Sequence, residues 1–125
     1  MATSADLLKG QRIMVVEDDY LVALALTAVL EGAGASIVGP VSAAREAVAL
    51  VEEGKEQIDA AILDVDLNGE KSYSVADALT RRHIPFVFAT GYGANAVDGR
   101  YRHHPRCQKP FDHDLLFKAL AACGH

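Results

Sequence analysis

The sequence lacks an excess of positive charge and lacks any apolar run long enough to cross a membrane. Its formal net charge is −5, whereas a nucleic-acid-binding domain normally carries a basic patch or stripe, so we expect no nucleic-acid partner. The longest apolar run, residues 21–30, is too short to span a bilayer. The N-terminus also lacks the basic and apolar segments of a signal peptide. We therefore predict a cytoplasmic protein with no membrane partner.

Cysteine is scarce, which excludes a disulfide scaffold. The two cysteines, Cys107 and Cys123, do not have CxxC spacing, and in an acidic cytoplasmic domain they are most simply two reduced thiols. His103 and His104 lie near Cys107 and suggest a soft-metal site. Two ligand types in one short segment, without a fourth ligand, are weak support for such a site.

The chain has no internal repeat, no low-complexity stretch and no linker. Its 125 residues, half of them hydrophobic, suffice for one domain with a substantial core. We divide the chain into a polar lead-in, residues 1–11, and a single domain, residues 12–125. Within that domain, strand-like and helix-like segments alternate.

Residues 35–39 are predicted to form a short second strand. Three apolar runs have the composition of buried strands: residues 13–16, 60–63 and 86–89. Pro85 marks the start of the last of them, and a fifth short strand is expected at residues 107–108. Alternation of strands with helices predicts right-handed βαβ units and a parallel sheet with helices on both faces. The expected fold class is therefore a small, doubly wound α/β domain.

Four helices are expected between and after these strands. The first ends at Gly32 and Gly34, the second is capped by Ser42 and ends at Gly54, and the third, residues 74–82, follows a turn at Asn68-Gly69. The last, near the C-terminus, is capped by Asp112. Their predicted inner faces are Val22, Ala25, Leu26 and Val29; Ala44, Ala47, Val48 and Val51; and Leu116, Ala119, Leu120 and Cys123.

Residues 91–105 break this alternation, because glycines lie there among polar residues without an apolar helical stripe. We expect a mobile loop. Arg100, Arg102 and Arg106 make this part of an acidic chain locally basic. Such a segment is most often a solvated loop, and a docking surface for an acidic partner is the alternative.

Polar side chains follow four of the predicted strands at the points where those strands end. Glu17, Asp18 and Asp19 follow the first strand, Asp64 follows the third, and Thr90 and Lys109 follow the last two. In an open parallel sheet, ligands bind in the crevice beyond the carboxyl ends of the strands. The sequence therefore predicts one site that contains all of these side chains.

The chemistry of this site follows from its charges. Two ionised carboxylates about 5 Å apart, at an effective dielectric constant of about 20, repel by roughly 3 kcal/mol, so a cation is needed to offset the repulsion. Carboxylate oxygens with room for water and phosphate suit Mg²⁺. Asp64 can attack a phosphoryl group and form an aspartyl phosphate, whose oxygens the Thr90 hydroxyl and the Lys109 ammonium can bind.

With these residues in this order, residues 12–123 resemble a response-regulator receiver domain of two-component signalling. The resemblance implies a flavodoxin-like (βα)5 fold with strand order 2-1-3-4-5. It implies that Asp64 is the phospho-acceptor, Thr90 the switch hydroxyl and Lys109-Pro110 the lysine-proline step, with a cis bond. Metal ligands would be Asp18, Asp64 and the backbone carbonyl of Asp66, with Glu17 acting through water. Asp19 is then expected to cap the first helix.

A narrower resemblance concerns the string Phe88-Ala89-Thr90-Gly91-Tyr92. It is similar to the signature of the FATGUY subgroup of receivers, which implies a single-domain regulator, a kinase of the HWE class and a short or disordered fourth helix. Arg106 stands where other receivers have an aromatic switch residue. We hypothesise that Tyr92 or Tyr101 takes that role, and that phosphorylation orders residues 91–105 by recruiting Thr90.

The resemblance implies a signalling module rather than an enzyme. Its partners would be a sensor histidine kinase or a histidine phosphotransfer protein, and a downstream protein target. Leu21, Leu24 and Leu26 of the first helix are core residues by default, although in the family the exposed side of this helix contacts the kinase.

Two alternatives remain open. Asp64-Val65-Asp66 also fits the D-x-D start of haloacid-dehalogenase-like phosphatases, which would turn over substrate. In those enzymes, however, the motif lies on the first strand and is followed by much more chain. A receiver fold that has lost phosphorylation and only binds a partner is the other alternative, and the intact Asp18, Asp64, Thr90 and Lys109 argue against it.

Overall fold

The computed structural model describes residues 8–67, 69–90, 101, 104, 106–108 and 116–120, with the backbone alone for residues 90 and 106–108. Residues 116–120 are helical. The other elements are β1 (Arg12–Val16), α1 (Tyr20–Gly32), β2 (Ser36–Val41), α2 (Ala44–Glu53), β3 (Ala60–Asp64), β4 (Asp66–Leu67), β5 (Glu70–Lys71), α3 (Tyr73–Arg81), β6 (Phe86–Thr90) and β7 (Arg106–Gln108).

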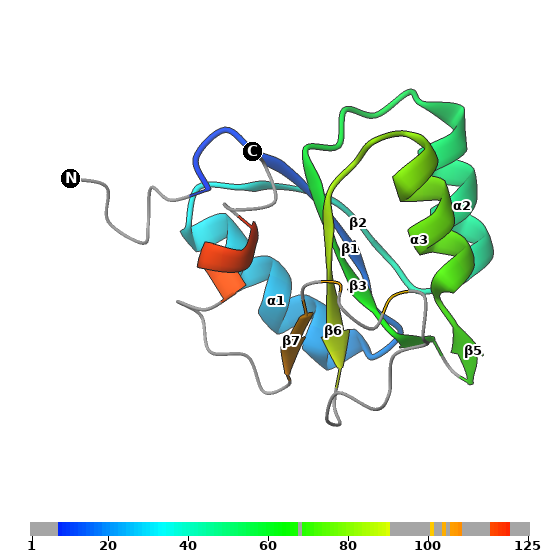
Figure 1. Ribbon diagram of the computed structural model, residues 1–125. Helices are drawn as coiled ribbons and strands as arrows, with labels where there is room; N and C mark the ends of the chain where they lie inside the picture. Colours follow the sequence, from blue (N-terminus) through cyan, green and yellow to red (C-terminus); the bar gives the residue numbers. More distant parts are fainter. Residues whose placement is uncertain are drawn as a thin grey trace.

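Five strands form one parallel sheet in the order β2-β1-β3-β6-β7. Helices α2 and α3 cover one face of the sheet, and α1 and residues 116–120 cover the other (Figure 1). Every residue of β3, at the centre of the sheet, is buried. A strand covered on both faces needs apolar side chains at every position, which explains the continuous apolar runs. The predicted doubly wound fold and strand order are confirmed.

The sheet separates two hydrophobic cores, and alternate residues of each strand belong to different ones. In β1, Met14 and Val16 face the core under α2 and α3. Ile13 and Val15 face the core under α1, which also contains Leu8. Leu8 is fully buried, and its N–H donates to the carbonyl of Ala33 at 3.0 Å. The packed structure therefore begins ahead of residue 12, within the segment predicted to be a polar lead-in.

The buried face of α1 differs from the predicted one. Ala23, Leu26 and Leu30 are buried, whereas Ala25 is exposed. Leucine, valine and alanine occur all around this helix, so the spacing of apolar residues does not fix which side faces the sheet. Of the leucines assigned to the core by default, only Leu26 is buried. The expected end of the helix at Gly32 is confirmed.

The start of α2 also differs from the expectation. Its N-cap residue is Ala43, without a capping side chain, so the predicted capping role of Ser42 is wrong. The rest of the helix agrees with the sequence, because Ala44, Ala47 and Val51 are buried and Gly54 ends the helix with φ of 67°. A left-handed residue at this position is a common helix end, and glycine adopts it without strain.

A short antiparallel hairpin, which the sequence analysis did not predict, joins β3 to α3. Asp66 pairs with Lys71 and Leu67 pairs with Glu70 across β4 and β5. The turn at its tip contains Gly69, whose φ is 91°. An Asn-Gly pair favours two-residue hairpin turns of this kind. The turn predicted at Asn68-Gly69 therefore indicated a hairpin.

Gly39 shapes the end of β2 that lies nearest to the predicted site. Its φ is 100°, and a Cβ atom there would lie 2.8 Å from the nitrogen of Val41 and 3.1 Å from the carbonyl oxygen of Val15. The pairing of β1 with β2 shifts register at this point. The shift lets Val41 accept a hydrogen bond from the N–H of Glu17 at 2.9 Å. Gly39 thus helps to place an acidic residue of the site.

Within the described parts of the chain, no helix has the length and apolar character needed to cross a membrane.

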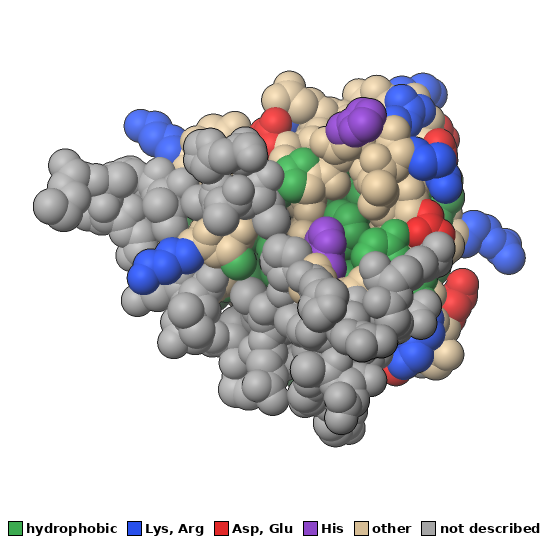
Figure 2. All heavy atoms as spheres, viewed as in Figure 1, with side chains coloured by type: hydrophobic (Ala, Val, Ile, Leu, Met, Phe, Trp, Pro, Cys, Tyr) green, Lys and Arg blue, Asp and Glu red, His purple; other side chains and the backbone are tan. Residues whose placement is uncertain are grey.

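On the face shown in Figure 2, basic and acidic side chains are interspersed on the side where α2 and α3 lie. Arg81 of α3 pairs with Glu52 of α2 at 2.5 Å, which lowers the pKa of Glu52 and raises that of Arg81.

We predict that Gly39→Ala destabilises the protein by about 2 kcal/mol, because the new Cβ atom meets backbone atoms and the positive φ disfavours alanine. Gly32→Ala is the matched control. Nothing lies within 4 Å of a Cβ atom there, and alanine is the better helix former, so stability should change by less than about 0.5 kcal/mol. Urea unfolding of the three proteins measures both effects, and equal stabilities for the two variants would contradict the prediction.

Candidate functional site

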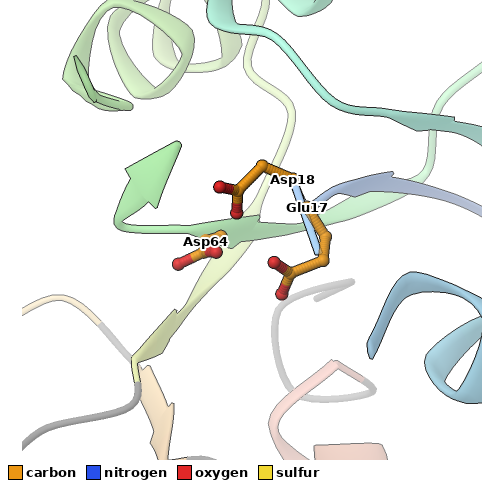
Figure 3. Close-up of side chains that lie close together, drawn as sticks. All are labelled: Glu17, Asp18 and Asp64. Carbon is orange, nitrogen blue, oxygen red and sulfur yellow. The ribbon is translucent and has the colours of Figure 1, made fainter. Parts of the chain in front are cut away.

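Three carboxylates meet beyond the ends of two neighbouring strands. Glu17 and Asp18 directly follow β1, and Asp64 is the last residue of β3. Because β1 and β3 are adjacent and parallel, with Val16 opposite Leu63, both strands deliver their next residues to the same edge. One oxygen of each side chain lies within 4.8 Å of those of the other two, and Figure 3 shows the three side chains side by side. Three predicted site residues are therefore brought together.

Backbone amides hold two of these carboxylates in place. Glu17 and Asp64 are only 4% and 7% exposed. The N–H of Asp19 donates to Glu17 at 3.1 Å, and the N–H of Asp66 donates to Asp64 at 3.2 Å. These two amides therefore fix the orientation of the buried carboxylates.

Asp19 has a different role from its two neighbours. Its side chain accepts hydrogen bonds from the N–H groups of Leu21 and Val22 at 3.0 and 3.1 Å. It is therefore the N-cap of α1, as the sequence predicted. The carboxylates of the site are those that precede this cap.

The donor set fits a hard divalent cation. Each residue of the cluster Glu17, Asp18 and Asp64 offers a carboxylate oxygen, which is the ligand type that Mg²⁺ and Ca²⁺ prefer over soft metals. Asp18 is half-buried, so one side of the cluster remains open to solvent. An open site with few protein ligands favours Mg²⁺, which keeps several of its waters.

Asp66 lies beside the cluster through its backbone rather than its carboxylate. Its side chain pairs with Lys71 across the hairpin at 3.0 Å, and both side chains are about half exposed. From the sequence, the backbone carbonyl of Asp66 was expected to be a metal ligand, whereas Lys71 was not identified. Only the hairpin brings this lysine next to the site, and a turn prediction without strands could not show that.

Thr90 and Lys109 were predicted at the ends of the next two strands. Thr90 is the last residue of β6, one position beyond Ala89, which lies opposite Asp64. Its backbone pairs with that of Gln108, the last residue of β7. The side chain of Thr90, the whole of Lys109-Pro110 and the expected cis bond lie outside the described residues.

A cavity of about 400 Å³ adjoins the carboxylate cluster at Asp18. The hairpin forms one of its walls with Leu67 and Glu70, and the start of α2 forms another. Its lining residues are Asp18, Ser42, Ala43, Ala44, Leu67 and Glu70. Ser42, expected to cap α2, thus lines this cavity instead.

Tyr101 is one of the two candidates for the aromatic switch residue, and it packs against α3 and β6. Its hydroxyl donates to Asp77 at 2.5 Å. Its ring stacks on Tyr73 with centroids 5.9 Å apart and meets Phe88 edge-on at 5.5 Å. Tyr92, the other candidate, lies outside the described residues, as do residues 91–100, for which a loop was expected.

His104 packs beside Tyr101, and both side chains lie against β6. Its Nε2–H donates to the carbonyl of Phe86 at 2.7 Å, and its ring stacks on that of Phe86 with centroids 4.0 Å apart. Burial lowers the pKa of His104, so the imidazole is neutral at physiological pH. The hydrogen bond to Phe86 occupies Nε2, one of the two ring nitrogens of His104. His103 and the side chain of Cys107, the other members of the suggested soft-metal site, lie outside the described residues.

The response regulator receiver domain model matches residues 13–121. The chain belongs to the response regulator receiver family. Its sheet, its two layers of helices and the acidic cluster at the strand ends are those expected for a receiver, and the resemblance stated from the sequence is confirmed.

Solved structures and a curated protein show which receivers this one is similar to. SdrG from Sphingomonas melonis Fr1 is 51% identical, with 90% of this chain and 95% of that one covered and a TM-score of 0.79. The BeF3-activated conformation of SdrG is 48% identical, with coverage of 98% and 100% and a TM-score of 0.77. PhyR, the phyllosphere-induced regulator of Methylorubrum extorquens, is 30% identical over 70% of this chain. The match spans 33% of PhyR, so this receiver corresponds to about a third of that protein's length.

We predict that Asp18→Asn stabilises the metal-free receiver and weakens its response to Mg²⁺. Removing one of three crowded carboxylates relieves their repulsion. Because Asp18 is half-buried, screening by solvent reduces the gain in stability to about 1 kcal/mol. The variant also loses a ligand, so the rise in melting temperature with added Mg²⁺ should fall well below that of the wild type.

Asp19→Asn is the matched control, since it removes the same charge one residue away and asparagine caps helices equally well. It should retain the Mg²⁺ response of the wild type. Thermal unfolding with and without millimolar Mg²⁺ compares the three proteins. The site assignment is wrong if both variants respond to Mg²⁺ as the wild type does.

Proposed function

We propose that this receiver accepts a phosphoryl group on Asp64 from a phosphohistidine, in a reaction that depends on Mg²⁺. The observation that carries the proposal is the position of Asp64, a buried carboxylate held by a backbone amide within 4.8 Å of two others. A carboxylate oxygen of Asp64 would attack phosphorus while the bond from phosphorus to the histidine nitrogen breaks. The electron pair of that bond leaves with the imidazole.

The other site residues take supporting roles in this proposal. Glu17, Asp18, Asp64 and the backbone carbonyl of Asp66 would hold the Mg²⁺ ion, directly or through water. Bound there, Mg²⁺ supplies positive charge to the phosphoryl oxygens. The Thr90 hydroxyl and the Lys109 ammonium would donate hydrogen bonds to the same oxygens. Thr90 supports this role by its place at the end of β6, next to the residue opposite Asp64.

The donor would be a sensor histidine kinase, with the HWE class as the specific expectation, or a histidine phosphotransfer protein. We assign the receiver to the FATGUY subgroup because Phe88-Ala89-Thr90 ends β6 and Gly91-Tyr92 follow in the sequence. Phosphorylation would change the conformation and the affinity for a downstream protein. The contacts of Tyr101 with Tyr73 and Phe88 support its role as the switch aromatic, and Tyr92 stays the other candidate.

The rival function is a phosphatase of the haloacid-dehalogenase type. In such enzymes the second carboxylate of D-x-D acts as acid and base, and the motif lies on the first strand. Here Asp64 ends the third strand of the sheet in chain order, and the carboxylate of Asp66 pairs with Lys71. Both observations favour the phospho-acceptor.

We predict a single phosphoryl adduct on the wild-type protein after incubation with acetyl phosphate, and only when Mg²⁺ is present. Asp64→Asn removes the nucleophile but keeps the shape of the side chain, so it should give no adduct. Intact-protein mass spectrometry measures both. Rapid multiple turnover without a lasting adduct would favour the phosphatase, and no adduct with no turnover would favour a receiver that only binds a partner.

The exposed apolar residues of α1 are the proposed contact for the kinase. Tyr20, Leu21 and Leu24 are 75%, 72% and 53% exposed. Tyr20 directly follows the N-cap residue of α1, which itself follows Glu17 and Asp18. Burial of a leucine on binding contributes about 1.5–3 kcal/mol. This face of the helix therefore offers apolar area next to the acceptor site.

We predict that the double variant Leu21→Ser/Leu24→Ser accepts the phosphoryl group from a phosphorylated histidine kinase at least about tenfold more slowly, because each lost contact weakens docking. Phosphorylation by acetyl phosphate, which needs no docking, should not change. Ala28→Ser, exposed one turn further along α1, is the control and should transfer at the wild-type rate. Equal rates for the double variant and the wild type from the kinase would rule out this surface.

A further inference from the structure

Tyr101 and His104 form an aromatic pair that packs against α3 and β6. The N–H of His104 donates to the carbonyl of Tyr101 at 3.0 Å, which joins the two residues in one turn. The Tyr101 hydroxyl donates to Asp77 of α3 at 2.5 Å. The Nε2–H of His104 donates to the carbonyl of Phe86 in β6 at 2.7 Å. One side chain therefore fastens the aromatic pair to a helix, and the other fastens it to the sheet.

The hydrogen bond to Phe86 serves a strand carbonyl at the edge of β6 that faces β7. The carbonyls of Pro85 and Ala89 accept N–H groups from the opposite side, where β3 lies. Because successive carbonyls of a strand point to opposite edges, the carbonyl of Phe86 points toward β7. The described part of β7 pairs with β6 from Phe88 onward. The imidazole of His104 thus supplies the donor for a carbonyl that lies ahead of this pairing.

The imidazole of His104 also lies among aromatic rings. It stacks on Phe86 with centroids 4.0 Å apart and meets Phe88 edge-on at 5.5 Å. Phe86 and Phe88 are 2% and 0% exposed, and the aromatic pair helps to cover both rings. Burial in these surroundings lowers the pKa of His104 more than its hydrogen bond to Phe86 raises it. The neutral imidazole is therefore the form that fits this position.

The titratable groups of α3 that lie beside the aromatic pair are Tyr73, Asp77 and Arg81. Tyrosine hydroxyls are neutral throughout the physiological range of pH. Asp77 accepts the hydrogen bond from Tyr101, and Arg81 pairs with a glutamate of α2. β6 meets the imidazole with phenylalanine rings and a backbone carbonyl, and the side chain of Arg106 in β7 lies outside the described residues. The two charges on α3 are opposite in sign and each has its own partner, so they do not offset a positive charge on His104.

We propose that the neutral imidazole of His104 is a latch, and that its protonation releases the aromatic pair from β6 and α3. A positive imidazole among these rings has lost part of its hydration, whereas in the released pair it faces water. The released state therefore binds the proton more tightly and is favoured as pH falls. Acidic conditions then uncover the rings of Phe86 and Phe88, an apolar surface that is covered at neutral pH. This device operates without phosphorylation and does not depend on the proposed function.

The direction and size of the pH dependence follow from the two states. In the released pair the pKa of His104 returns to its ordinary value of 6.5, and in the latched pair it lies lower. The latch therefore holds fully above pH 6.5 and weakens as pH falls from there through the lowered pKa. Between about pH 7.5 and 5.5 the ratio of released to latched molecules should rise by up to about tenfold, because the released imidazole gains a proton over this range.

Native-state amide hydrogen exchange at residue 104 tests the proposal. This N–H donates to Tyr101, and an isolated surface turn gives an amide little protection once the side chains have let go. Its protection, corrected for the intrinsic effect of pH on exchange, should fall by up to about tenfold from about pH 7.5 to 5.5. The N–H of Leu8, which donates to Ala33 in the other core, is the internal control and should keep its protection.

Two variants identify the titrating group. His104→Gln keeps a side-chain N–H donor but does not titrate, so protection at residue 104 should no longer depend on pH. His83→Asn is the matched control, because His83 is exposed and has φ of 57°, which asparagine tolerates. It should show the pH dependence of the wild type.

Three results would overturn the proposal. An equal fall in protection at residue 104 in His104→Gln would assign the effect to another group. A parallel fall at Leu8 would show a general loss of stability rather than a local release. A pKa of His104 at or above 6.5, measured in the wild type by NMR of the imidazole nitrogens, would mean that stacking on Phe86 stabilises the charged ring.

Discussion

Mutual repulsion among three carboxylates is the constraint on which the rest of this structure depends. Glu17, Asp18 and Asp64 lie within 4.8 Å of one another, and two of them are almost fully buried. Such an arrangement is unfavourable unless the fold imposes it and a cation offsets it. The adjacent parallel strands β1 and β3 impose it, because each ends at the same edge of the sheet. A cation bound among these carboxylates would relieve the repulsion that the fold imposes.

The sheet can impose this crowding because it is covered on both faces. Met14 and Val16 pack under α2 and α3, while Ile13 and Val15 pack under α1. Neither strand can move without disturbing the close packing of two cores. At the edge of the sheet, Gly39 lets β2 reach far enough for Val41 to hold the backbone of Glu17. The precision of the site therefore comes from residues that do not belong to it.

The sequence predicted those parts of the structure in which one physical signal dominates. Buried parallel strands leave continuous apolar runs, so the strands and their ends could be placed, and with them Glu17, Asp18 and Asp64. The buried side of α1 could not be placed, because its apolar residues surround the helix and only packing selects Ala23 over Ala25. The pair of Asp66 with Lys71 was missed for another reason. It depends on the register of a hairpin, which the turn at Asn68-Gly69 permits but does not by itself establish.

The same hairpin bears on the choice between a phospho-acceptor and a phosphatase. Both functions start with attack by the first carboxylate of a D-x-D string, and they diverge in what the second carboxylate does afterwards. An enzyme that turns over needs this group free to move a proton at every cycle. In this receiver the second carboxylate is that of Asp66, and a lysine directly across the hairpin holds it. A signalling protein benefits from the opposite property, because a phosphoryl group that persists can be detected by a partner. The pairing of Asp66 with Lys71 therefore fits a phospho-acceptor better than a phosphatase.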